Sequence, residues 1–98
     1  MKNKKISVVV SVYNEELSLN QFYKTTVDVL EQCAWDYELI FVNDGSQDKS
    51  VALLKSFAEE NKKVKVVDFS RNFGHEAAMI AGIDYAKGDG IVCMDADL

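Results

Sequence analysis

The sequence has 98 residues, which is the size of one small domain. Hydrophobic residues make up 48% of it, and it contains five glycines and no proline, so a disordered tail and a collagen-like or low-complexity segment are excluded. Eleven Lys and Arg against sixteen Asp and Glu give a net charge of −5, which argues against nucleic acid as the main partner. A phosphorylated ligand would need a cation to bind such an acidic chain.

The cysteines and the N-terminus bear on the cellular compartment. Cys33 and Cys93 lie in separate apolar segments. This spacing predicts two buried, reduced thiols in a cytoplasmic protein rather than a disulfide or a metal site. The lysine-rich start followed by residues 6–12 imitates a signal peptide, but the apolar stretch is short, β-branched and lacks a small-residue cleavage site. No apolar run approaches the roughly 18 residues of a membrane span.

In the first half of the chain the hydrophobic period changes from strand-like to helix-like and back. Residues 6–12 are β-branched and almost entirely apolar, as in a strand that is buried on both faces. Apolar residues at steps of three and four then predict an amphipathic helix over 19–34, with Ser18 and Gln21 as its capping box. Residues 37–42 read as a second strand, closed by an Asn-Asp-Gly-Ser turn.

The second half continues this alternation. Asp48 is placed to cap a helix whose apolar positions lie in 51–58. Residues 64–69 form a third expected strand, 77–85 a helix rich in small residues, and 91–94 a fourth strand. The order βαβαβαβ, without linker or repeat, predicts an α/β fold with a parallel sheet, right-handed crossovers and helices on both faces.

Each expected strand is followed by a polar cluster. The clusters are residues 14–16, 43–46, 70–72 and 95–97. In open α/β sheets, ligands bind beyond the carboxyl ends of the strands, where the strand order reverses. Four clusters at that edge therefore predict one binding site.

Two nucleotide-binding motifs are absent from the turns, and their absence limits the chemistry that this site can perform. There is no G-x-G-x-x-G after the first strand and no G-x-x-x-x-G-K-[ST], so a dinucleotide dehydrogenase and a P-loop NTPase are excluded. The rim instead offers Glu15, Asp44, Asp95 and Asp97, with Arg71 as the basic counterpart. Carboxylates one residue apart after a buried strand can ligate a hard divalent cation. Such an ion would bridge an acidic pocket to a diphosphate and stabilise the leaving group.

Four motifs together resemble family 2 glycosyltransferases with the GT-A fold. They are Ser-Val-Tyr-Asn-Glu-Glu at 11–16, Val-Asn-Asp-Gly-Ser-Gln-Asp at 42–48, Ser-Arg-Asn-Phe-Gly-His-Glu-Ala-Ala at 70–78 and Asp-Ala-Asp-Leu at 95–98. The third is similar in particular to the polyprenyl-phosphate branch, the dolichol-phosphate mannosyltransferase-like and bactoprenol glucosyltransferase-like enzymes. The resemblance runs from Ile6 to Leu98 and implies a Rossmann-like, nucleotide-sugar-binding half-domain over 1–98, truncated before the acceptor half.

The resemblance also implies roles for single residues. Ser11, Tyr13 and Glu15 would hold the nucleotide base and ribose. The residues implied at the nucleotide-sugar site as a whole are Ser11, Tyr13, Glu15, Val42, Asp44, Arg71, Asp95, Ala96 and Asp97.

Three carboxylates carry the more specific roles in this resemblance. Asp44, beside Val42, would hydrogen-bond the base. Asp95 and Asp97 would face the sugar and the diphosphate, as the candidate catalytic residues and as ligands of Mg²⁺ or Mn²⁺, with Asp97 the stronger metal ligand.

Two positions depart from the family pattern. Ser11 stands where the first motif usually has proline, which loosens a rigid turn. Asn43 replaces the first of two aspartates in the second motif, whereas the base-contacting aspartate is kept as Asp44.

Structural alternatives stay open for several of these residues. Asp44 could simply shape a turn, and Glu16 reads as a solvated helix start. Arg71 could pair with neighbouring carboxylates instead of a diphosphate. His75 reads as a structural or surface histidine, and Met94 as a core residue.

The expected reaction is inverting, metal-dependent transfer of a hexose from a nucleotide diphosphate sugar to a polyprenyl phosphate or another glycan or lipid acceptor. Uridine diphosphate is the favoured carrier, and the full-length protein is expected at the cytoplasmic face of the membrane. Residues 1–98 alone are expected to be inactive, because the acceptor half would follow Leu98, and to self-associate through an exposed sheet edge. Two alternatives remain: a haloacid-dehalogenase-like phosphatase, because 91–97 is an apolar strand ending in Asp-x-Asp, and a non-catalytic nucleotide-binding module.

Overall fold

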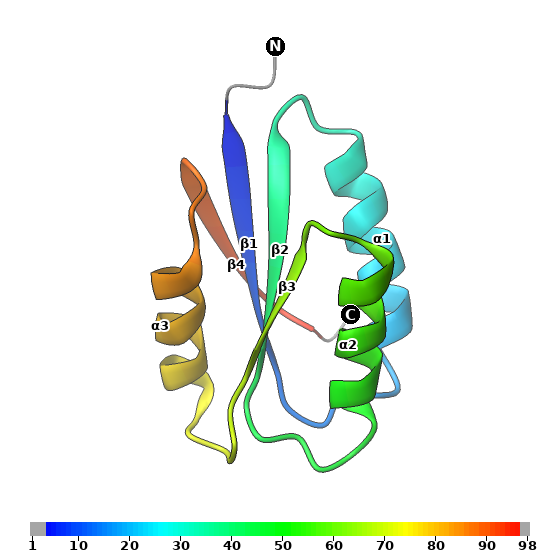
Figure 1. Ribbon diagram of the computed structural model, residues 1–98, viewed down its shortest axis with the longest axis vertical. Helices are drawn as coiled ribbons and strands as arrows, with labels where there is room; N and C mark the ends of the chain where they lie inside the picture. Colours follow the sequence, from blue (N-terminus) through cyan, green and yellow to red (C-terminus); the bar gives the residue numbers. More distant parts are fainter. Residues whose placement is uncertain (1–3, 97–98) are drawn as a thin grey trace.

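Apolar strand segments and amphipathic segments alternate in the sequence, and the structure alternates in the same way (Figure 1). The computed structural model describes residues 4–96. Within that range no helix is long and apolar enough to cross a membrane. The predicted βαβαβαβ order is confirmed. The elements are β1 (Lys5–Val12), α1 (Leu19–Glu31), β2 (Asp36–Asn43), α2 (Ser50–Glu60), β3 (Val64–Asp68), α3 (His75–Tyr85) and β4 (Gly90–Asp95).

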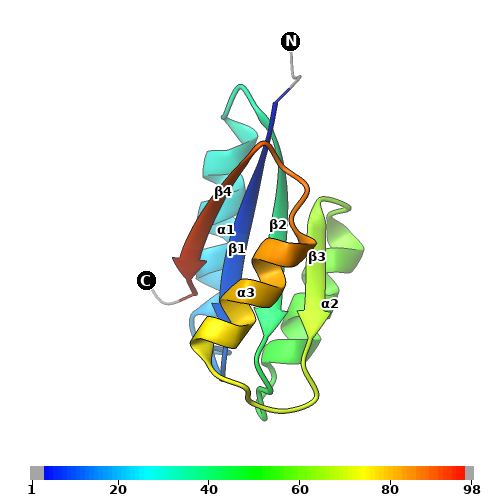
Figure 2. The ribbon, with the colours of Figure 1, turned by 90° about the vertical axis from the view of Figure 1, so that its left-hand side faces the viewer.

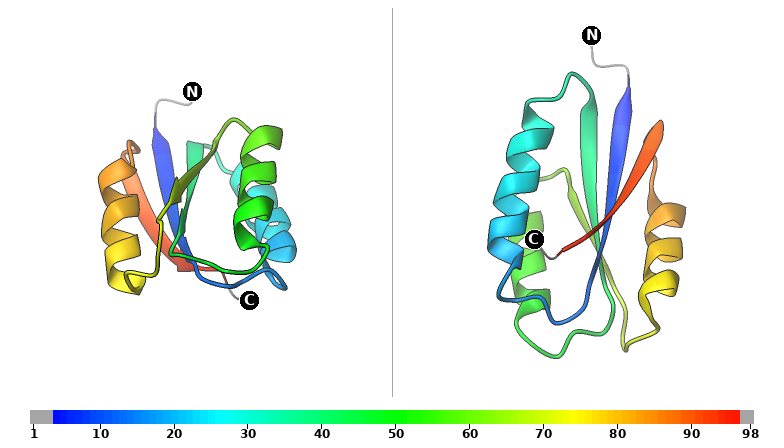
Figure 3. Two further views of the ribbon diagram at one scale, coloured as in Figure 1. Left: turned by 60° about the horizontal axis from the view of Figure 1, so that its bottom comes forward. Right: turned by 180° about the vertical axis from the view of Figure 1, so that it is seen from behind.

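The four strands form one parallel sheet with the order β3-β2-β1-β4. The chain moves outward from β1 through β2 to β3, and α3 then returns it to the other side of β1. Helices α1 and α2 cover one face of the sheet and α3 covers the other (Figures 2 and 3). The strand order therefore reverses between β1 and β4, which is where an α/β fold of this kind binds its ligands.

Alternation along β1 and β2 gives the domain two hydrophobic layers. Val8, Val10 and Val12 belong to the larger cluster beneath α1 and α2. Val9 belongs to the smaller cluster beneath α3, together with Ile40, Val42 and Ala78. Full burial of one such aliphatic side chain stabilises a fold by about 1.5–3 kcal/mol. Both faces of the central strands are thus needed for the core, as the apolar run at 6–12 predicted.

Helix α3 lies close to the sheet because it has a glycine where it crosses the strands. A Cβ atom at Gly82 would lie 2.3 Å from Val9 Cγ1 and 3.1 Å from Val42 Cγ2. The first of these distances is well below van der Waals contact, so any side chain here would push the helix off the sheet.

A buried carboxylate joins the α3–β4 connection to the sheet. Glu38 is 3% exposed, and its Oε2 accepts the Ser7 hydroxyl and the backbone N–H of Lys87, each at 2.6 Å. Ser7 Oγ in turn accepts the backbone N–H of Gly88 at 2.8 Å. Burial by itself raises the pKa of Glu38, but these hydrogen bonds and two nearby lysines outweigh it, so the pKa is lowered.

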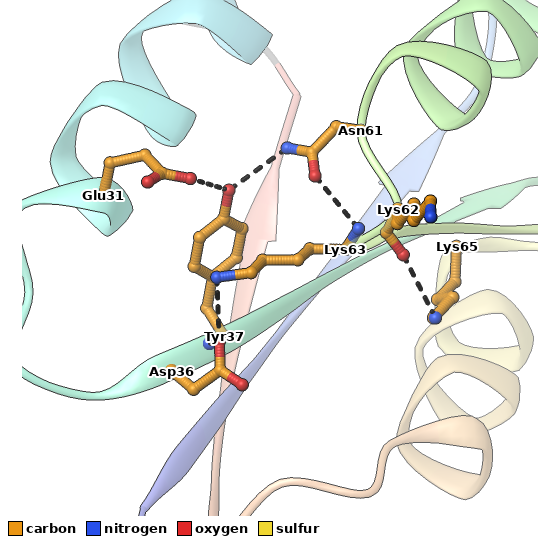
Figure 4. Close-up of polar contacts among 7 residues, drawn as sticks. All are labelled: Glu31, Asp36, Tyr37, Asn61, Lys62, Lys63 and Lys65. Carbon is orange, nitrogen blue, oxygen red and sulfur yellow. Dashed lines mark hydrogen bonds and ion pairs between the residues drawn. The ribbon is translucent and has the colours of Figure 1, made fainter. Parts of the chain in front are cut away.

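A second polar cluster lies at the amino edge of the sheet (Figure 4). The Tyr37 hydroxyl donates to Glu31 Oε2 at 2.6 Å and accepts from Asn61 Nδ2 at 3.1 Å. Lys63 Nζ lies 2.9 Å from Asp36 Oδ1 and 4.6 Å from the centre of the Tyr37 ring. These contacts tie the ends of α1 and α2 to the starts of β2 and β3. The polar clusters that follow the strands lie at the opposite edge of the sheet, at the carboxyl ends of the strands.

The structure corrects the expected burial of both thiols and of Met94. Cys33 and Cys93 are free, as predicted, but both are exposed, and Met94 is 38% exposed. Cys33 follows the end of α1, whereas Cys93 and Met94 lie on β4. Since β4 is an edge strand of this sheet, its apolar side chains are only partly covered within residues 4–96. Apolar character alone therefore overestimated burial on this strand.

We expect Gly82→Ala to destabilise the domain by about 1–3 kcal/mol, because the added methyl group would overlap Val9. Gly90→Ala is a matched control, since a Cβ atom there would meet only Trp35, at 3.8 Å. Urea unfolding monitored by circular dichroism measures both variants. Equal stability of the two alanine variants would contradict close packing of α3 on the sheet.

We expect Glu38→Gln to lower stability by about 1–3 kcal/mol near neutral pH, because a buried, hydrogen-bonded carboxylate is lost. Because the folded-state pKa lies below the ordinary value of 4.5, the carboxylate contributes fully above that value and its contribution is lost as the pH falls through the folded pKa. The difference between wild type and variant should therefore stay constant from neutral pH down to about pH 4.5 and shrink below that value in urea titrations. Glu59→Gln, on the exposed side of α2, is the control, and an equal pH dependence of both differences would refute the role of Glu38.

Candidate functional site

A cleft of about 490 Å³ opens at the carboxyl edge of the sheet. The loops after β1 and β2 and the loop before α3 lie together at the lower end of Figure 1. Residues from the ends of all four strands line the cleft, so the structure brings the four polar clusters together. The lining residues are Ser11, Tyr13, Glu15, Asp44, Asn72, Gly74, His75, Asp95 and Ala96.

Reciprocal hydrogen bonds join the loop after β1 to the loop after β2. Asn14 has a φ of 54°, a left-handed conformation that asparagine tolerates. Its backbone N–H donates to Ser46 Oγ at 2.9 Å, and its Oδ1 accepts the backbone N–H of Gln47 at 2.8 Å. The backbone N–H of Glu15 donates to Ser50 Oγ at 2.9 Å. These bonds fix two of the four clusters relative to each other.

Glu16 belongs to the same connection. Its backbone N–H donates to Asp48 Oδ2 at 3.2 Å, and its Oε1 accepts the backbone N–H of Lys49 at 3.3 Å. The expectation that Glu16 lies at the solvated start of the first helix is therefore wrong. Helix α1 begins only at Leu19, and the Glu16 carboxylate instead meets the N-terminus of α2, where the helix dipole favours a negative charge.

The predicted helix caps had different outcomes. The N-cap residue of α2 is Lys49 rather than the predicted Asp48, but Asp48 Oδ1 accepts the backbone N–H of Ser50, the first residue of the helix, at 2.9 Å. Ser18 makes no side-chain cap on α1, so the capping box with Gln21 is wrong. The Ser18 hydroxyl donates to Glu15 Oε2 at 3.3 Å instead. A carboxylate four residues before the first residue of α1 thus competes with the helix backbone for this hydroxyl.

Asp44 is the most buried carboxylate of the cleft, at 3% exposure. Its Oδ1 accepts the backbone N–H of Phe73 at 2.7 Å, and its Oδ2 accepts the N–H of Gly74 at 3.1 Å and Nδ2 of Asn72 at 3.0 Å. Gly45 allows this approach, because its φ is 74° and a Cβ atom there would lie 2.3 Å from the backbone of Arg71. Asp44 therefore shapes the loop before α3, and a ligand would share its carboxylate with that loop.

His75 is exposed, with 58% of its side chain accessible, and it lines the cleft. Its Nδ1 is 2.9 Å from Ser11 Oγ, and its Nε2 is 3.8 Å from Asp95 Oδ1. His75 is the first residue of α3. That position was the signal that could have found it, because a helix that follows a strand in this fold begins at the carboxyl edge.

Two of the other residues implied at the site do not line this cleft, and a third lies outside the described residues. Val42 is fully buried with Val9 in the core beneath α3, so a ligand contact by its side chain is ruled out here. Arg71 lines a neighbouring hollow of about 390 Å³, and its guanidinium carbon lies 4.8 Å from the centre of the Phe73 ring. Asp97 lies outside the described residues.

The donor set for a divalent cation is only partly in view. Within residues 4–96, no three His, Cys, Asp or Glu side chains are grouped so that they could hold a metal ion. Asp95 supplies one carboxylate that is 68% exposed and faces the cleft. Oxygen ligands of this kind suit Mg²⁺ or Mn²⁺, so Asp95 fits as one ligand of such an ion.

A larger open groove, of about 650 Å³, lies between the C-terminal parts of α1 and α2. Two of its polar side chains are engaged with each other, because the Tyr23 hydroxyl donates to Glu60 Oε2 at 3.3 Å. We place the functional site at the carboxyl edge, because that cleft alone gathers side chains from all four strand ends described here.

Comparison with known families decides between the interpretations of this cleft. The model of glycosyl transferase family 2 matches residues 7–98. The chain belongs to this family. Membership favours the glycosyltransferase interpretation over the phosphatase alternative.

Two relatives illustrate the similarity. A glycosyltransferase of Bacillus subtilis (strain 168), YkcC, is 51% identical over 92 residues, which are 94% of this chain and 28% of the relative. A prophage bactoprenol glucosyl transferase homolog of Escherichia coli (strain K12) is 43% identical over 96% of this chain and 31% of its own length. The chain thus spans about three-tenths of the length of these relatives.

Solved structures identify the fold as that of GT-A glycosyltransferases. The mannosyltransferase PcManGT from Pyrobaculum calidifontis, in complex with GDP-Man and Mn²⁺, matches with a TM-score of 0.79 and 21% identity over 96% of this chain and 28% of that one. S. aureus TarS in complex with UDP matches with a TM-score of 0.79 and 20% identity over 95% of this chain and 27% of that one. The predicted Rossmann-like GT-A fold is therefore confirmed.

We expect Asp44→Ala to release the loop before α3. Each lost hydrogen bond to this carboxylate contributes about 0.5–1.5 kcal/mol, so amide exchange at Phe73 and Gly74 should accelerate roughly tenfold or more. Hydrogen exchange with mass spectrometry measures this, with Asp84→Ala on the exposed side of α3 as the control. Unchanged protection at 72–75 would show that Asp44 is not the anchor of the loop.

Proposed function

We propose that residues 1–98 form the donor-binding part of an enzyme that transfers a hexose from a nucleotide diphosphate sugar to a polyprenyl phosphate. The observation that carries this proposal is the convergence of four polar strand ends on one cleft, at the switch point of a family 2 chain. Sites at such switch points bind nucleotides in α/β folds.

The lining of the cleft supports a nucleotide donor. Tyr13 is 47% exposed and presents its ring at the mouth, where a base can stack on it. Glu15 is an acceptor for ribose hydroxyls, and Asp44 is an acceptor for the base. We favour a uridine diphosphate sugar, in keeping with the UDP complex of the similar fold in TarS.

The acidity of the cleft supports a requirement for Mg²⁺ or Mn²⁺. Glu15, Asp44 and Asp95 would repel a diphosphate if no cation lay between them. Asp95 and Asp97 are the residues that would hold the ion, and when bound it neutralises negative charge on the diphosphate leaving group. PcManGT, which has a similar fold, has been solved in complex with GDP-Man and Mn²⁺.

The acceptor follows from the relatives and from the chemistry. Relatives of this chain are named as bactoprenol glucosyl transferases, which supports a polyprenyl phosphate acceptor at the cytoplasmic face of a membrane. The phosphate oxygen of such an acceptor is already anionic, so attack on the anomeric carbon needs little base catalysis. Positioning of the two substrates would supply most of the rate. Direct displacement of the diphosphate would invert the anomeric configuration.

We expect Asp44 and Asp97 to separate in their effects on ligand binding. Asp44→Ala should weaken uridine itself roughly tenfold, because the base loses its acceptor. Asp97→Ala should leave uridine binding unchanged and weaken only UDP-sugar binding in the presence of Mn²⁺. Calorimetry on the full-length protein, with Mn²⁺ or with a chelator, measures both.

The control for these titrations is Asp84→Ala, an exposed carboxylate on α3 outside the cleft. Tight UDP-sugar binding in the chelator would contradict the proposed metal requirement. Equal losses of uridine binding in Asp44→Ala and Asp97→Ala would contradict the assignment of base and diphosphate to the two residues.

A further inference from the structure

Ser11, His75 and Asp95 form a row across the switch point of the sheet. Ser11 and Asp95 are partners in the pairing of β1 with β4, so both side chains lie on the face that α3 covers. His75, at the start of α3, lies between them, with Nδ1 2.9 Å from Ser11 Oγ and Nε2 3.8 Å from Asp95 Oδ1. Three elements that are distant in sequence thus meet through one imidazole ring.

The chemistry of the two neighbours favours one arrangement of the hydrogens. Nε2 lies 3.8 Å from Asp95 Oδ1, which is beyond hydrogen-bond distance. Because an ionised carboxylate only accepts hydrogen bonds, the tautomer with its proton on Nε2 is the one that attracts Asp95. In the neutral ring Nδ1 is then an acceptor, and the Ser11 hydroxyl donates to it. The hydroxyl of Ser11 therefore selects the form of His75 that can hold Asp95.

Within residues 4–96, the His75 ring is the side chain placed to orient the Asp95 carboxylate. Asp95 ends an edge strand and is 68% exposed. Among residues 4–96, the side chain paired with it is that of His75. A freely rotating carboxylate must be ordered each time a ligand binds, and that ordering weakens binding.

We propose that His75 is a positioning residue that holds Asp95 ready for the donor, and that Ser11 acts by orienting His75. This inference rests on the proposed function of the cleft. It assigns to Ser11 an indirect role in place of the base or ribose contact expected from the sequence. It also assigns a role to His75, which the sequence alone indicated as a structural or surface residue.

Substitution of His75 by asparagine or by glutamine tests the roles of the two ring nitrogens separately. Asn places an amide near the position of Nδ1, so His75→Asn keeps a partner for Ser11 and loses the contact with Asp95. Gln reaches the position of Nε2, so His75→Gln keeps a donor for Asp95. His75→Ala removes both, and Glu76→Gln, exposed in the same helical turn, is the control.

The experiment measures uridine binding, Mn²⁺-dependent UDP-sugar binding, KM and kcat with these variants of the full-length protein. For His75→Ala we expect roughly two- to fivefold weaker UDP-sugar binding and a similar rise in KM, with uridine binding unchanged, since one contact between exposed groups is lost. His75→Gln should restore most of this loss, and His75→Asn should not. Wild-type behaviour of His75→Ala, or equal rescue by Asn and Gln, would overturn the proposal.

A spectroscopic readout separates failure of this inference from failure of the proposed function. His75 is the single histidine of the 98 residues, and His75→Gln identifies its signals in nitrogen-15 spectra of the full-length protein. We expect a protonated Nε2 and an acceptor Nδ1 in the wild type, with a mixture of tautomers in Asp95→Asn or Ser11→Ala. If the wild type binds no UDP-sugar, the proposed function is refuted. A tautomer that neither substitution changes overturns the Ser11–His75–Asp95 contact whether or not the donor binds.

Discussion

The reversal of strand order at β1 is the constraint on which the rest of this structure depends. Two strands, β2 and β3, are added on one side of β1, and the remaining strand β4 is added on the other. The helix that makes this return, α3, must cross the face left open by α1 and α2. Its N-terminus consequently comes to the carboxyl edge, between the ends of β1 and β4. His75 and Asp95 reach the same cleft as Ser11 for this topological reason, before any specific contact forms.

A second constraint is the burial of Asp44 at that edge. A carboxylate at 3% exposure is tolerated only when donors satisfy its oxygens. The loop before α3 supplies them from two backbone amides and one side-chain amide. This requirement orders a loop that has no regular secondary structure of its own. It also makes a glycine at position 45 necessary, because any side chain there would overlap the loop backbone. The buried charge thus determines the shape of one wall of the cleft.

The order of elements, the parallel sheet and the meeting of the polar clusters could be predicted from the sequence, because all three follow from local periodicity and from the geometry of parallel strands. What failed depended on the neighbours that a segment finds in space. Cys93 lies in an apolar run like that of β1, yet within residues 4–96 β4 pairs with β1 alone and its side chains are exposed. Ser18 has the sequence of a helix cap, yet Glu15 takes its hydroxyl. Val42 adjoins a polar cluster in sequence, yet strand alternation turns its side chain into the core.

Exposure separates acidic residues that look alike in the sequence. Glu38 and Asp44 are buried and hydrogen-bonded to the backbone of the α3 layer, so their charges stabilise the fold, and Asp44 would share its carboxylate between the loop before α3 and the proposed base. Asp95 is largely exposed, with a single side-chain partner within the described residues, so its lone pairs remain open to a ligand. A carboxylate cannot be both fully satisfied by the protein and free to hold a cation, because each oxygen has a limited number of acceptor directions. The division between acids that stabilise the fold and the acid that is open to a cation therefore follows from position: Glu38 within the central strand β2 and Asp44 directly after it are buried, whereas Asp95 at the end of β4 is exposed.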